Sequence, residues 1–78
     1  MSENIGYIFV LYSINRVNEI VLSYLTSYIP NLKEELRNIG YELIDWRVEK
    51  DTLSLVLLLY GRLDNTELVE KTIEMNLL

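Results

Sequence analysis

The stretch from Thr52 to Gly61, "TLSLVLLLYG", constrains the fold of this 78-residue chain more than any other segment. A strand with one face in water alternates apolar and polar residues, whereas this run is apolar on both faces. Such a strand needs neighbours along both edges and a cover on each face. The run therefore predicts a central strand, and it raises the question of what covers its second face.

The first half of the chain predicts a strand followed by helix. Residues 5–13 are dense in β-branched and aromatic side chains and are also apolar on both faces. Pro30 lacks an amide hydrogen, so a helix that begins after this strand is expected to stop or kink there. A second helix is predicted to restart at Asn31, which forms a capping box with Glu34, and to stop at Gly40. The apolar stripe of the first helix consists of Ile14, Val17, Val21, Tyr24, Leu25 and Tyr28.

The second half predicts a hairpin and a last helix. In "YELIDWRVEK", apolar Ile44, Trp46 and Val48 alternate with polar residues, which is typical of a half-buried strand. The polar letters "EKD" then turn the chain into the apolar run. A final helix is predicted to be capped by Asp64, with Glu67 completing the box. The inward side of that helix is expected to be Leu68, Val69, Ile73 and Leu77.

These elements give the order β, broken α, β, β, α in a single domain spanning residues 1–78. A right-handed crossover from the first strand to the second, with the hairpin strand between them, gives a three-stranded antiparallel sheet of order 1-3-2. Helices then cover one face of the sheet. The predicted class is α+β, with a KH-like or truncated ferredoxin-like architecture.

One apolar sheet face is left without cover in this arrangement. If Leu53, Leu55, Leu57 and Leu59 lie beneath the helices, the other residues of the run face outward beside one face of the first strand. Burying six such side chains is worth on the order of 10 kcal/mol gross, so a protein partner is expected there. The alternative is that the C-terminal "MNLL" folds back as cover. The predicted interface residues are Ile8, Val10, Tyr12, Val56, Leu58 and Tyr60.

The composition argues against catalysis. The chain has no His and no Cys, which removes the commonest general base, the thiol nucleophile and nearly all metal ligands. The carboxylates of Asp45, Glu49 and Asp51 are expected to form a solvated face with Arg47 rather than an acid–base pair. No glycine-rich phosphate loop is present. We expect no enzyme, no catalytic residue, no metal and no cofactor, and oligomerisation is the remaining way to stabilise so small a domain.

Charge and hydropathy narrow the partners further. Seven basic residues against twelve acidic ones give a formal net charge of −5, which opposes binding to phosphate backbones and to anionic membranes. The segment "IGYIFVLYSI" is too short to span a bilayer and lacks the basic start of a signal peptide. We expect a soluble cytoplasmic protein without direct nucleic-acid or membrane contacts.

The letters "LYGRLDNTELVEKTIEMNLL" resemble the turn and helix of the small dimerising subunit of KEOPS, the complex that makes threonylcarbamoyladenosine on tRNA. The order strand, helix, hairpin, helix is also similar. The resemblance implies a non-catalytic subunit that forms a homodimer, or a heterodimer with a related small subunit, and bridges larger catalytic subunits in tRNA processing. The residues that carry it are Asp64, Thr66, Leu68, Thr72, Ile73 and Leu77.

The order of elements also resembles the eukaryotic type of KH domain. That fold binds RNA through a Gly-x-x-Gly loop between its first two helices, where this chain has "SYIPN". The alternative function is therefore a KH-like or ferredoxin-like module that binds RNA or a small ligand. A viral or mobile-element accessory protein is a further alternative.

Overall fold

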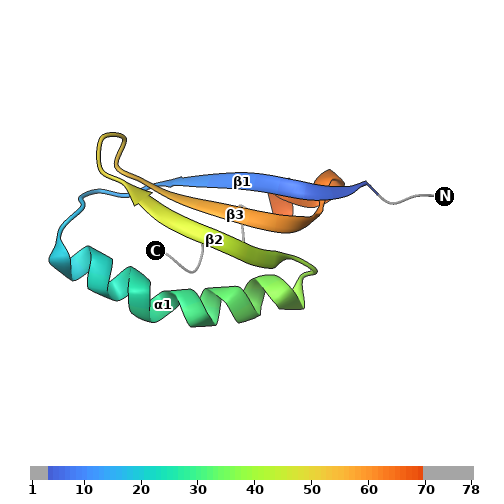
Figure 1. Cartoon of the computed structure of the whole chain (residues 1–78), viewed down its shortest axis with the longest axis horizontal. Coiled ribbons are helices and arrows are strands. Elements are labelled where there is room, and N and C mark those ends of the chain that lie inside the picture. The colour runs from blue at the N-terminus through green and yellow to red at the C-terminus, as the bar shows by residue number, and fades with distance from the viewer. Residues whose placement is uncertain (1–3, 70–78) are drawn as a thin grey trace.

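The structure is a computed structural model, and it describes residues 4–69 of the chain. Three strands and one long helix make up most of this part (Figure 1). A short 3-10 helix, η1, follows the last strand, and residues 66–69 continue it as helix. The bounds are β1 (Ile5–Ser13), α1 (Glu19–Asn38), β2 (Glu42–Glu49), β3 (Ser54–Arg62) and η1 (Leu63–Asn65).

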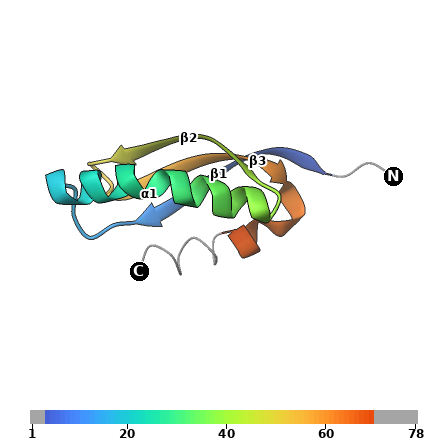
Figure 2. The same ribbon diagram turned by 90° about the horizontal axis from the view of Figure 1, so that it is seen from below.

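The three strands form one antiparallel sheet in the order β1-β3-β2, which confirms the predicted topology and the α+β class. The apolar run is the central strand, β3, and pairs along its length with both neighbours. α1 lies along one face of the sheet (Figure 2). We call the face beneath α1 the inner face and the opposite one the outer face.

The core fills the space between α1 and the inner face. Leu55, Leu57 and Leu59 of β3, on the face assumed to be covered, are fully buried there, because alternate residues of a strand point to the same side. Leu53 does not join them, since it lies in the hairpin turn with a φ of 49°. The remaining buried apolar residues of this core are Ile8, Val10, Leu25, Leu32, Leu36, Tyr41, Leu43 and Val69.

The predicted helix break at Pro30 is wrong, because α1 runs through the proline as one helix of 20 residues. Its true N-cap is Asn18, whose side chain accepts a hydrogen bond of 2.9 Å from the amide of Val21. A proline inside a helix costs about 3 kcal/mol. α1 buries Leu25 before the proline and Leu32 and Leu36 after it, and each burial is worth about 1.5–3 kcal/mol. Packing therefore outweighs the local cost.

The predicted stop at Gly40 is confirmed. Gly40 has a φ of 91°, a left-handed conformation that residues with a Cβ avoid. Its amide donates to the carbonyl of Arg37, and the amide of Tyr41 donates to the carbonyl of Leu36. These two bonds are a Schellman motif, which satisfies carbonyls left free at the helix end and turns the chain toward β2.

β2 departs from the clean alternation that its letters predict. Its register against β3 shifts between Leu43 and Asp45, as in a β-bulge. Ile44 is therefore 46% exposed instead of facing inward, and Leu43 is buried in its place. Trp46 and Val48 pack against the core as predicted. One extra residue in the strand is enough to reverse the side to which its first half points.

The end of the described chain also differs from expectation. Asp64, the predicted cap, lies inside η1, and no side chain caps η1. The Asp64 carboxylate instead contacts the guanidinium of Arg62 at 3.3 Å. Val69 is buried as predicted, whereas Leu68 is 48% exposed instead of facing inward. The predicted inward positions Ile73 and Leu77, and the segment "MNLL", lie outside the described residues.

Candidate protein interface

The exposed side of β1 is the main feature of the outer face. Tyr7, Phe9 and Leu11 are 66%, 63% and 64% exposed, although all three are large and apolar. They alternate with inward-pointing residues along a strand that carries no charge and no proline. β1 is also an edge strand of the described sheet. Natural edge strands usually carry charges, prolines or bulges that prevent unwanted pairing, and this one has none of them.

The face of β1 that was predicted to form the interface points into the core instead. Ile8 and Val10, predicted at the interface, are buried in the core, and Tyr12 packs against that core. Residues directly opposite in a ladder share a face. Ile8 pairs with the buried Leu59, so Ile8 and every second residue from it along β1 point to the inner face. Because both faces of β1 are apolar, the pattern of its apolar residues does not decide which face points inward.

The three residues predicted on β3 do lie on the outer face. Val56, Leu58 and Tyr60 stand opposite Leu11, Phe9 and Tyr7 in the β1–β3 ladder. The rings of Tyr7 and Tyr60 meet edge to face, with their centroids 5.0 Å apart. Their role in an interface stays a prediction. We define the outer patch as Ile5, Tyr7, Phe9, Leu11, Val56, Leu58 and Tyr60.

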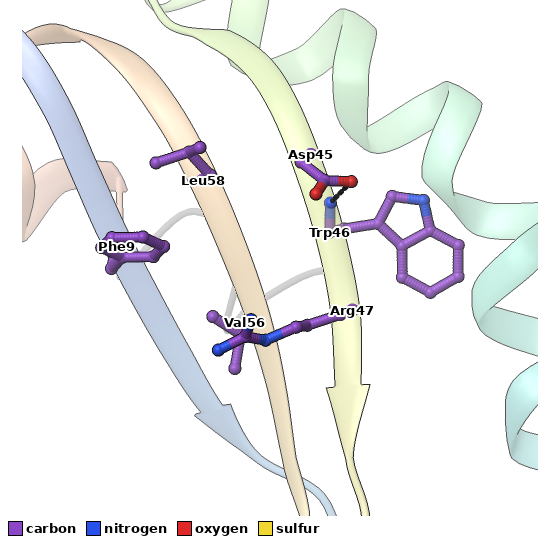
Figure 3. Close-up of a pocket in the computed structure, with 6 residues that line it drawn as sticks. All are labelled: Phe9, Asp45, Trp46, Arg47, Val56 and Leu58. Atoms are coloured by element: carbon purple, nitrogen blue, oxygen red, sulfur yellow. Dashed lines mark hydrogen bonds between the residues drawn. The ribbon is translucent and has the colours of Figure 1, made fainter.

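β2 adds a charged rim beside the outer patch. Arg47 reaches from β2 across the central strand, so that its guanidinium lies over Val56 (Figure 3). Val56 is only 7% exposed, although no helix among residues 4–69 covers this face. The Nε atom of Arg47 is 2.7 Å from the carboxylate of Glu49. The aliphatic part of Arg47 thus covers apolar surface, while its guanidinium stays in water beside the Glu49 carboxylate.

A shallow hollow opens at the junction of the patch and the rim. Its volume is about 210 Å³, smaller than the ~300–1,000 Å³ typical of small-molecule sites. The Trp46 indole points away from it toward α1, and the Asp45 carboxylate accepts a 2.8 Å hydrogen bond from the Trp46 amide (Figure 3). A hollow of this size fits one side chain of a binding partner. Its lining residues are Phe9, Asp45, Trp46, Arg47, Val56 and Leu58.

Perturbed titratable groups lie away from this face. Burial, reinforced by the nearby Glu35 carboxylate, raises the pKa of Tyr28 on α1 to about 12. The Tyr28 hydroxyl donates to that carboxylate at 3.3 Å. Burial also raises the pKa of Tyr41, whose hydroxyl donates to the carbonyl of Arg62 at 2.7 Å. Both tyrosines keep their protons at neutral pH, so these shifts create no acid–base pair.

Searches of the described residues for a metal site and for a membrane-spanning helix are both negative. Within residues 4–69 no group of three or more carboxylate, His or Cys side chains is placed to hold a metal ion. In the same range, no helix combines the length and apolar character that crossing a bilayer requires. Comparisons with family models, with curated proteins and with solved structures find no match for this chain.

A sequence signal for the correct face of β1 does exist. Gly6 pairs with Gly61, and both lie on the inner face, where Leu63 and Tyr41 occupy the space that side chains would fill. Glycine inside a strand often marks such a close approach. The parity of Gly6 therefore places Tyr7, Phe9 and Leu11 outside, which residue type alone does not reveal.

Proposed function

We propose that this protein is a small non-catalytic assembly subunit of the cytoplasm, and that its outer patch binds another protein. The observation that carries the proposal is the exposure of Tyr7, Phe9 and Leu11, at 63–66%, on a sheet face that the described chain does not cover. Contiguous exposed apolar surface of this kind marks interaction sites in soluble proteins.

The energy at stake supports a partner. A whole aromatic side chain offers about 150–250 Å², so the exposed part of the outer patch is on the order of 500 Å². At about 25 cal/mol per Å², covering this area is worth roughly 12 kcal/mol before the costs of association. A domain's whole stability is about 5–15 kcal/mol. The gross energy of covering the outer patch is therefore comparable with the net stability of a whole domain.

The polar groups favour a protein over RNA. On β2, Glu42, Asp45 and Glu49 outnumber the cation of Arg47. Arg62, at the end of the patch, contacts the Asp64 carboxylate, and the whole chain has a net charge of −5. An acidic surface repels a phosphate backbone. The KH-like alternative also loses its loop, because residues 27–31 lie inside the unbroken α1. The KEOPS-like role remains one form of the proposal, with a tRNA-modifying catalytic subunit as the partner.

Capture from the native host tests the proposal with two matched variants. Phe9→Asp puts a charge in the centre of the patch, and Ile20→Asp puts the same charge on α1, at a side chain that is 80% exposed. Asp is also favourable in the first turn of a helix, so the control should fold normally. We expect Phe9→Asp to abolish specific co-purification of the protein that wild type captures, whereas Ile20→Asp retains it.

The circular dichroism spectra of both variants establish whether the fold is kept. If folded Phe9→Asp captured the same protein as wild type and Ile20→Asp, the outer patch would not be the binding surface, and the proposal would be wrong.

A further inference from the structure

The face that the proposed function assigns to a partner has a surface that complements itself. We propose that the occupant is a second copy of this chain, packed outer face to outer face. In this arrangement a two-fold axis runs across the strands at the level of Phe9 and Leu58, which stand opposite each other in the ladder. This inference rests on the proposed function and adds the identity of the partner and the geometry of the contact.

Side-chain size along the patch supports this axis. The ladder has five outward rows, and Phe9 with Leu58 is the middle one. Tyr7 with Tyr60 lies on one side of it and Leu11 with Val56 on the other. A two-fold axis through the middle row lays the large tyrosine row of one copy over the small Leu–Val row of the other. An axis parallel to the strands would instead oppose tyrosines to tyrosines. Interfaces pack as closely as protein cores, so large against small is favoured.

Charge along the rim supports the same axis. In the ladder, Arg47 stands at the level of Val56, and Glu42 stands at the level of Tyr60. The proposed axis exchanges these two levels, so Arg47 of each copy approaches Glu42 of the other. Two such pairs form per dimer. Asp45 stands at the level of Leu58, so the axis brings the Asp45 carboxylates of the two copies near each other. This like-charge contact opposes the arrangement, and its cost is reduced because both carboxylates lie at the solvent-exposed rim.

The area buried is large enough for a stable dimer only if the outer faces of the two copies pack against each other. Two patches of about 500 Å² each, together with the flanking rims, approach the ~1,200–2,000 Å² of specific interfaces. Pairing of two β1 edges would satisfy backbone groups but would leave Tyr7, Phe9 and Leu11 in water on one continuous sheet. Only the face-to-face arrangement covers the side chains that make this surface unusual.

Sedimentation equilibrium and thiol cross-linking test the proposal together. Sedimentation equilibrium of the wild-type protein is expected to give a mass twice that of the 9.2 kDa chain. The chain has no Cys, so Leu58→Cys introduces a unique thiol. Two such thiols face each other near the axis between sheets about 10 Å apart, whereas edge pairing would separate them by three strand spacings, about 14 Å. A short bismaleimide should therefore link Leu58→Cys into dimers and leave the α1 control Tyr24→Cys unlinked.

Each outcome of these two experiments either supports or overturns the proposal. A dimer that cross-links through Leu58→Cys but not through Tyr24→Cys supports the proposal, and a dimer without the Leu58→Cys link overturns the geometry. A wild-type mass of one chain at every concentration overturns the second copy as partner. If that monomer still shows Phe9-dependent capture of a different protein, only this inference fails. If it shows no Phe9-dependent capture, the proposed function fails with it.

Discussion

Gly61→Ala is expected to lower the free energy of unfolding by about 3 kcal/mol, because overpacking of a closed core has costs of this order. A Cβ at this position would overlap the ring of Tyr41, 2.8 Å from its Cε1, and would lie 2.9 Å from the carbonyl oxygen of Gly40. The Tyr41 ring is 3% exposed, and its hydroxyl is bonded to the carbonyl of Arg62. The ring therefore cannot move aside without losing that bond.

Gly6→Ala is the matched control, because Gly6 pairs directly with Gly61. Its new Cβ would meet the Cδ1 of Leu63 at 3.3 Å, and this flexible side chain can shift by the few tenths of an ångström required. Urea denaturation at one fixed protein concentration compares the two variants, since self-association would make stability depend on concentration. Equal unfolding midpoints for Gly61→Ala and Gly6→Ala would contradict the packing described around Tyr41.

Leu57→Ala is expected to lower the free energy of unfolding by a similar amount, because it leaves a cavity in the core rather than overpacking it. Leu57 is fully buried at the middle of β3, and removing a buried leucine side chain costs about 2–5 kcal/mol. A single core of this size supplies only about 3–5 kcal/mol. The variant should therefore be largely unfolded at 25 °C unless a partner stabilises it.

Leu53→Ala serves as its control, because Leu53 is 41% exposed in the hairpin turn and has the same residue type. Far-ultraviolet circular dichroism during urea titration measures both. Leu53→Ala should remain folded with a small shift of midpoint. A Leu57→Ala protein as stable as Leu53→Ala would show that β3 is not the centre of the core.

The sheet topology was predictable from the sequence because two independent rules agree on it. Crossover handedness places the third strand in the middle, and "TLSLVLLLYG" is the strand whose composition suits that place. Those rules do not decide which face of β3 points inward, but the face that was assumed to be covered, with Leu55, Leu57 and Leu59, is the buried one. These features depend on general rules of chain geometry and on composition, and not on the details of packing.

The parts that could not be predicted depend on tertiary contacts. The face of β1 is set by its register with β3, and with apolar residues on both sides only the small Gly6 reveals it. The bulge at Ile44 is an irregularity of pairing that leaves no mark in the alternating letters. Pro30 remains helical because burial on both sides of it compensates for its cost. The outward face was therefore predicted correctly on β3 and reversed on β1, and the binding role of that face stays a prediction.

Thiol accessibility in the native assembly tests most directly whether the outer patch is covered. Leu11→Cys and Ile20→Cys place unique thiols at side chains that are 64% and 80% exposed in the single chain, one on the outer patch and one on α1. After denaturation, both should react with a maleimide at the same rate. In gently prepared host extract, we predict that Leu11→Cys reacts far more slowly than Ile20→Cys. Equal rates in that extract would contradict the claim that a protein covers this face.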